Sequence, residues 1–148
     1  MLAFFRERFG IPEVAFEGYL LIERGRNIWI VRDSPHVHVA APHGIHTFGL
    51  RLARETSIGL KPTTYGLQVF GRHATRNRAE LSREDAVRFL RGKDVQLEPS
   101  ADLEPGFTVV ASEGFVLGCG LYKGTGLLRS LIPKKIRLDA PRDEPPAP

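Results

Sequence analysis

The alternation of hydrophobic and polar positions predicts short helices and strands in the first half of the chain. The expected elements are helices at 2–9 and 12–16, strands at 19–24, 27–32 and 48–55, and a turn leading into a helix over 59–70. Gly10 is suited to end the first helix, and Gly25 with Arg26 separates two β-rich runs, which indicates a β-hairpin. Residues 33–45 contain prolines and a glycine, so a loop is expected there.

The second half has a different pattern, with one helix among several short strands. The expected strands are 78–81, 95–97, 107–111, 115–122 and 127–131. Ser82 is suited to cap a helix that runs to residue 91, because Asp85 stands three residues later, as in a variant of the capping box. Gly92 is suited to end that helix. Short strands around one helix indicate a small β-barrel.

These patterns divide the chain into three predicted parts. Residues 1–71 are expected to form an N-terminal α/β unit, residues 72–138 a β-barrel unit, and residues 139–148 a disordered, proline-rich tail. The composition, 42% apolar and 26% charged over 148 residues, is that of a folded protein with a core. The expected fold class is α+β.

Basic residues are concentrated in the second unit. Residues 72–138 hold 12 basic and 8 acidic residues, whereas residues 1–71 hold 8 and 6, and the tail holds 1 and 3. No acidic residue falls between Gly114 and Leu138, where five basic residues stand. A row of cations without acidic partners, beside tight glycine turns, indicates an edge that faces an anion. A nucleic-acid backbone is the large anion that fits best.

The order of motifs in the second unit resembles that of a PUA domain, a small RNA-binding pseudo-barrel. The motifs are the helix end FLRGKDV at 89–95, the strand VLGCG at 116–120, and the basic segment LLRSLIPKKIR at 127–137. They are most similar to the PUA-like module of ribosomal RNA cytosine-5 methyltransferases of the Sun/Fmu type. In the first half, residues 48–53 and 61–65 resemble the small unit that precedes that module.

The resemblance does not extend to catalysis. Such methyltransferases carry a glycine-rich cofactor loop and paired catalytic cysteines, whereas this chain has no such loop after a strand and one cysteine, Cys119. Cys119 stands in an apolar run and is expected to be a buried hydrophobe. No spacing of acidic residues and histidines singles out an acid–base pair either. We therefore expect a non-enzymatic protein without a cofactor.

The resemblance implies that RNA is held by the turn after the helix and by the last strand, to which the sequence adds a cationic stretch from residue 72. The candidate RNA-binding residues are Arg72, Arg76, Arg91, Gly92, Lys93, Lys123, Arg129, Lys134, Lys135 and Arg137. Gly92 would let a backbone N–H approach a phosphate. Tyr122 has two interpretations, a ring that stacks on a base or a core aromatic.

Four histidines, His36, His38, His43 and His46, fall within eleven residues. Such spacing can bind zinc or nickel, but no cysteine is near and Asp33 is the only nearby carboxylate. The alternation of Val37 and Val39 with the histidines fits a half-exposed strand. We expect solvent-facing or hydrogen-bonded histidines and no metal.

The function expected is binding of structured ribosomal or transfer RNA in ribosome biogenesis or RNA modification. The alternative is a non-catalytic subunit that recruits an RNA-modification enzyme or an assembly factor, and a third interpretation is a small enzyme with an unrecognised site. No apolar run approaches the length of a membrane span. The apolar start of the chain, within residues 1–7, is too short for a signal peptide because charged residues follow directly. The protein is expected to be cytoplasmic.

Overall fold

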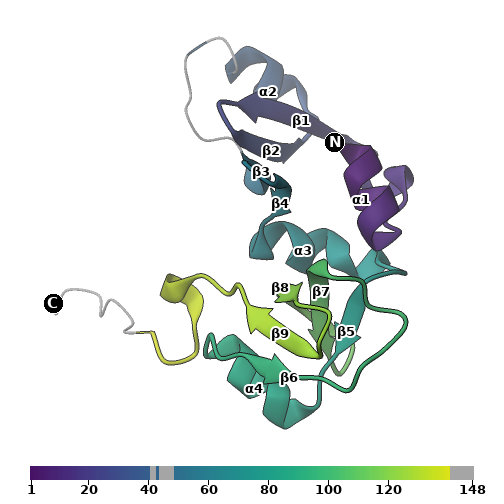
Figure 1. The fold of residues 1–148 in the computed structure, drawn as a ribbon. Coiled ribbons are helices and arrows are strands. Elements are labelled where there is room, and N and C mark those ends of the chain that lie inside the picture. Colours follow the sequence, from purple (N-terminus) through teal and green to yellow (C-terminus); the bar gives the residue numbers. More distant parts are fainter. Residues whose placement is uncertain (41–42, 44–48, 141–148) are drawn as a thin grey trace, which may run out of the picture.

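The computed structural model describes residues 1–40, 43 and 49–140, and contains two β-sheets with a helix between them (Figure 1). The first sheet is antiparallel, in the order β1 (Tyr19–Arg24), β2 (Asn27–Arg32), β3 (Leu50–Thr56) and β4 (Gly59–Pro62). The second has the order β5 (Arg78–Glu80), β7 (Gly106–Ser112), β8 (Phe115–Tyr122), β9 (Leu127–Ser130) and β6 (Val95–Gln96). Of its pairs, β5 with β7 is parallel.

The helices are short. They are α1 (Leu2–Phe9), α2 (Pro35–Ala40), α3 (Thr64–Phe70) and α4 (Arg83–Leu90), with 3-10 turns η1 (Glu13–Phe16), η3 (Gly71–His73) and η4 (Lys134–Ile136). The predicted helix at 2–9 is confirmed, and Gly10 ends it in the left-handed conformation. None of the helices in the described part of the chain is long and apolar enough to cross a membrane.

The first sheet packs against α1 and η1 through an aromatic cluster. Phe5 and Phe9 of α1 are fully buried, and Phe16 stacks on Phe70 with ring centroids 4.7 Å apart. The inward residues Ile28 and Ile30 of β2 complete this side of the core. The predicted hairpin is confirmed, since β1 and β2 pair around a turn at residues 25–26.

Two segments of the first half differ from the prediction. Residues 35–40 form α2, where a loop and a half-exposed strand of alternating valines and histidines were expected. Pro35 stands in the first turn, where the missing N–H costs nothing, and His38 bonds Asp33 at 2.9 Å. Residues 59–62 form the edge strand β4, where a turn was expected, because Leu60 and Lys61 pair with β3 and Pro62 is tolerated at an edge.

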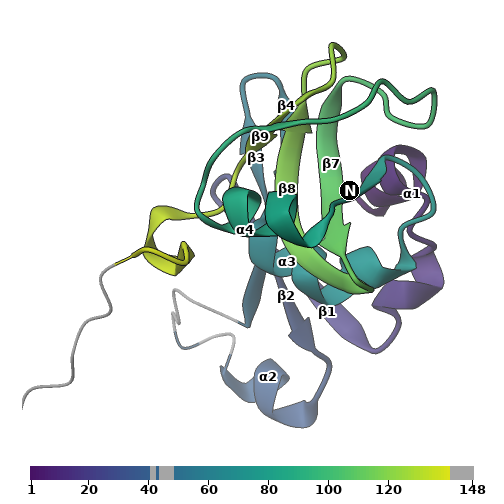
Figure 2. The same cartoon turned by 90° about the horizontal axis from the view of Figure 1, so that it is seen from below.

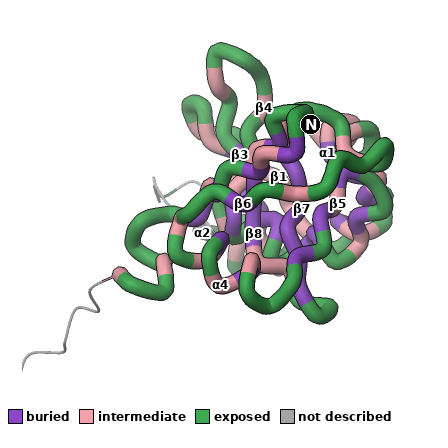
Figure 3. Tube along the Cα trace, turned by 60° about the horizontal axis from the view of Figure 1, so that its bottom comes forward, coloured by how far each residue is buried: buried purple, intermediate pink, exposed green. Residues whose placement is uncertain are grey.

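The second sheet is curled into a half-barrel around α4 (Figure 2). The Ser82 cap is confirmed, since its hydroxyl accepts the Asp85 N–H at 3.2 Å, and α4 buries Ala86 and Phe89 against the sheet. The edges β5 and β6 are not paired with each other, so the sheet is open rather than a closed barrel. The fold is α+β. Figure 3 shows buried stretches in β7 and β8 and exposed segments around them.

The two sheets share a core. Helix α3 packs against both β3 and β8, and Val109 and Cys119 of the second sheet belong to the same buried cluster as Phe5 and Leu52 of the first half. The backbone also connects the halves, because the Phe9 carbonyl accepts the N–H groups of residues 75 and 76 at 2.9 and 3.0 Å. The division of the chain into two units at residue 72 therefore stays a prediction. Core contacts and backbone hydrogen bonds connect residues on the two sides of this boundary.

Candidate nucleic-acid interface

The C-terminal end of α4 and the segment after β9 lie side by side. Ser130 donates its hydroxyl to the Phe89 carbonyl at 2.7 Å, and the Leu138 N–H donates to the Leu90 carbonyl at 3.2 Å. Between these points Ile132 is buried against Phe89 and its neighbours. The packing therefore brings the two regions that the sequence analysis selected, residues 91–93 and 129–137, onto one surface.

Gly92 has a role other than the one expected. Its φ is 79°, and its N–H donates to the Phe89 carbonyl at 2.9 Å, so this N–H is already bonded within the helix end. A Cβ at this position would overlap the Arg137 guanidinium. The glycine makes room for a side chain of the protein, and the expected approach of its N–H to a phosphate is not available.

Arg137 is correspondingly part of the scaffold. Its side chain is half-buried over Gly92, and its Nε donates to the Ile132 carbonyl at 3.2 Å. These contacts fix the turn η4 against α4, so removing Arg137 would alter structure as well as charge.

Six other predicted basic side chains are exposed at the end of α4, in the β8–β9 turn, on β9 and in η4, and we call them the C-terminal basic surface. They are Arg91, Lys93, Lys123, Arg129, Lys134 and Lys135. Arg91 pairs with Asp139 at 3.3 Å, and within residues 1–40, 43 and 49–140 the other five form no ion pair. Lys123 and Arg129 are on the same outer face, because Arg129 pairs with Leu121, two residues before Lys123. Tyr122 lies on the inner face, 3% exposed, and is a core aromatic.

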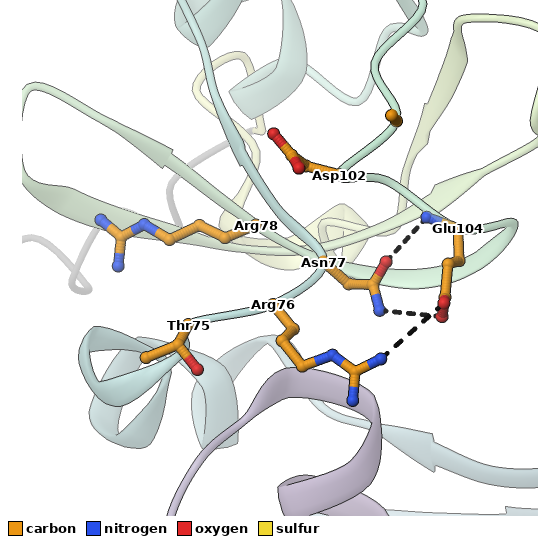
Figure 4. Close-up of a pocket in the computed structure, with 7 residues that line it drawn as sticks. Thr75, Arg76, Asn77, Arg78, Asp102 and Glu104 are labelled. Atoms are coloured by element: carbon orange, nitrogen blue, oxygen red, sulfur yellow. Dashed lines mark hydrogen bonds and ion pairs between the residues drawn. The ribbon is translucent and has the colours of Figure 1, made fainter.

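The second cationic stretch, from residue 72, is arranged differently. Arg72 is exposed and donates to His73 at 3.1 Å, and Arg76 lies 3.8 Å from a Glu104 oxygen. Arg76 lines a polar hollow of about 420 Å³ together with Asp102 and Glu104 (Figure 4). Carboxylates thus stand among the cations here, which lowers the attraction for a polyanion.

Asn77 also lines that hollow. It is 2% exposed with φ at 48°, its amide donates to the Arg8 carbonyl at 2.8 Å, and its oxygen accepts the Glu104 N–H at 2.8 Å. Arg8 in turn donates to the carbonyls of Phe107 and Glu104 at 2.8 and 2.7 Å. Burial lowers the pKa of the Arg8 guanidinium, and the nearby Glu104 acts in the opposite direction. These bonds tie α1 to the loop before β7, which is a structural role.

Sequence reasoning did not select three basic residues of the first sheet. Arg51, Arg54 and Lys61 are exposed and line a hollow that Pro133 borders, one residue before Lys134. The available signal was the placement of cations at outward positions of two neighbouring strands, but their proximity to residue 133 depends on the tertiary fold.

Neither the described histidines nor Cys119 belongs to a group of three or more possible metal ligands in the described part of the chain. His36 and His43 are exposed, His38 bonds Asp33, and His46 lies outside the described residues. No three histidine, cysteine or acidic side chains gather within the described part of the chain. Cys119 is 1% exposed, and burial raises the pKa of its thiol to about 12, so the thiol stays protonated at neutral pH.

Comparison with protein families gives a match over the second half of the chain. The model of the family described as "Methyltransferase RsmF PUA domain" matches residues 76–138. This segment is therefore a PUA-like module resembling that of RNA methyltransferases, in agreement with the sequence analysis. The match covers only the PUA region and includes no catalytic domain. A comparison with curated proteins found no match.

Proposed function

We propose that the PUA-like module binds structured RNA through the C-terminal basic surface. The observation that carries the proposal is the set of exposed cations, Lys93, Lys123, Arg129, Lys134 and Lys135, that have no carboxylate partner in the described part of the chain. Charges left unpaired on one surface attract a polyanion, and each lysine or arginine that neutralises a phosphate releases condensed counterions.

Binding of this kind recognises shape and backbone. Phosphate contacts position a nucleic acid without reading its bases, so the surface favours a folded RNA whose phosphates match the spacing of the cations. The family resemblance supports ribosomal or transfer RNA as the ligand, with a role in ribosome biogenesis or RNA modification. In this proposal residues 1–71 form a unit that precedes the module, and the protein contributes binding without catalysis.

A protein partner is the second candidate. Phe115 and Ile58 are 75% and 85% exposed next to the β7–β8 and β3–β4 turns, and exposed apolar side chains favour contact with another protein. A cluster of ion pairs that neutralised the basic surface would favour this candidate. Arg91 pairs with Asp139, but the other five cations of the C-terminal basic surface form no ion pair in the described part of the chain. RNA binding is therefore the better supported function.

A salt series with a charge-matched control tests the proposal. The variant Arg129→Gln/Lys134→Gln is compared with Arg6→Gln/Arg83→Gln, which removes two exposed charges from the outer faces of α1 and α4. If both residues contact phosphates, the plot of log affinity against log salt becomes shallower by about 1.4 to 1.8 in the first variant. The control is expected to keep the wild-type slope. If Arg129→Gln/Lys134→Gln also keeps the wild-type slope, the protein-partner alternative is favoured.

A further inference from the structure

A small cationic hollow lies where the first sheet meets the segment after β9. Its volume is about 170 Å³, and Arg51, Arg54 and Lys61 of β3 and β4 line it, together with Tyr65 of α3 and Pro133. Pockets for small-molecule ligands usually measure about 300 to 1,000 Å³, so this one suits a phosphate group or a single ring. Cys119 also lines the hollow, and Cys119 belongs to the core that the two sheets share.

The positions of the cations around the hollow lower the stability of the folded protein. Arg54 and Lys61 are directly opposite each other in the β3–β4 pair, and like charges at such positions are destabilising. No described carboxylate forms an ion pair with Arg51, Arg54 or Lys61. The neighbouring Glu55 does not compensate them, because it lines a different hollow with Met1 and Phe4.

The same charge pattern extends across the sheet. Arg24 pairs with Asn27, Asn27 with Arg54, and Arg54 with Lys61, so three cations and one amide form a row over all four strands. This row crosses the sheet from β1 to β4 and contains no acidic residue. An anion bound along it would remove the repulsion that the bare protein carries.

The hollow also adjoins the chain segment that carries part of the C-terminal basic surface. Pro133 borders it, and the exposed Lys134 follows directly at the start of η4. Tyr65 adds a second kind of contact, since this residue lines the hollow and is 41% exposed. Cations beside an accessible aromatic ring are the combination that holds a nucleic-acid strand with unpaired bases.

We propose that this hollow is a second contact for the same RNA. Arg51, Arg54 and Lys61 bind backbone phosphates there, and the Tyr65 ring stacks on an adjacent unpaired base. The inference rests on the proposed function and extends the RNA path from the PUA-like module to the first sheet.

The first test removes the opposed charges. Arg54→Gln/Lys61→Gln is compared with wild type and with the control Arg6→Gln/Arg83→Gln in the same salt series. The slope of log affinity against log salt is expected to become shallower by about 1.4 to 1.8. The melting temperature is expected to stay equal or rise, because a like-charge pair is removed. Weaker RNA binding in an equally stable protein thus separates a ligand contact from a folding role.

The outcomes distinguish this inference from the proposed function. If Arg129→Gln/Lys134→Gln lowers the slope while Arg54→Gln/Lys61→Gln keeps the wild-type value, the hollow is not an RNA contact and the proposed function stands. If the wild-type protein binds no structured RNA, both proposals fail.

The second test concerns Tyr65. Tyr65→Leu keeps an apolar side chain but removes the ring, and is expected to weaken binding to a stem–loop RNA by about fivefold or more. Binding to a fully paired duplex is expected to stay unchanged, because its bases are not free to stack on the ring. An equal loss with both RNAs, or no loss, would overturn the assignment of Tyr65.

Discussion

Single residues hold together parts of the chain that are far apart in sequence, and Asn77 does this most clearly. Its left-handed backbone and buried amide satisfy the Arg8 carbonyl and the Glu104 N–H at once. Asparagine is one of the few residues that tolerates this conformation. The same side chain thus shapes the turn and fastens α1 to the loop before β7.

Asn77→Ala is expected to destabilise the protein by about 2 to 4 kcal/mol, because it leaves two buried polar groups unpaired and strains the backbone. Asn77→Gly removes the same hydrogen bonds without the strain, and is expected to be about 1 kcal/mol more stable than the alanine variant. Urea unfolding of both variants measures the two contributions. Equal stability of Ala and Gly would show that the positive φ costs nothing here.

At the scale of elements, the candidate interface depends on how η4 is fixed to α4. The Ser130 hydroxyl, the Ile132 side chain and the Arg137 guanidinium all contact the α4 end or the turn after it. Lys134 and Lys135 are exposed in this arrangement, and their side chains form no ion pair within the described part of the chain. Rigid presentation of charges lowers the conformational entropy lost on binding.

Gly92→Ala is expected to loosen this junction. The substitution forces an alanine into φ 79° and pushes against Arg137, with a cost of about 1 to 2 kcal/mol from the backbone alone. Thermal unfolding and RNA affinity are both expected to fall. In the Arg137→Ala background the same change is expected to cost less, since the steric part is gone. An identical cost in both backgrounds would mean that Arg137 does not pack on Gly92 in solution.

At the scale of the whole molecule, the two sheets are coupled by α3. Leu67 is fully buried in the cluster that contains residues of both halves, and the Thr64 hydroxyl accepts the Cys119 N–H at 3.4 Å. This packing places the hollow around Lys61 next to Pro133, so the proposed RNA path depends on it. Movement of one sheet relative to the other would separate the two basic surfaces.

The shared core predicts that both sheets unfold together. Leu67→Ala is expected to destabilise the protein by about 2 to 5 kcal/mol and to lower amide protection in β1–β4 and in β7–β9 alike. Leu128→Ala, which empties part of the second cluster only, serves as a comparison in hydrogen-exchange measurements. Protection lost only in the first sheet after Leu67→Ala would indicate that the unit predicted to begin at residue 72 folds on its own.

Much of the local structure followed from the sequence alone. The β1–β2 hairpin, the Ser82-capped helix and the β7–β8 hairpin are set by turn residues, capping groups and hydrophobic periodicity within about ten residues, which is the range over which such signals act. The basic C-terminal segment and the likeness of the second unit, predicted as 72–138, to a PUA module were also readable in the sequence; the family match covers 76–138. The RNA role of the predicted site residues stays a prediction.

Contacts between residues far apart in the sequence depend on the tertiary fold. Local sequence does not state that Arg137 covers Gly92, that Glu104 stands beside Arg76, or that β4 adds an edge strand to the first sheet. The same holds for the hollow in which Lys61 comes to lie near Pro133. Each of these contacts depends on how α3 and the two cores pack, and packing free energy is summed over side chains from the whole chain rather than from any one segment.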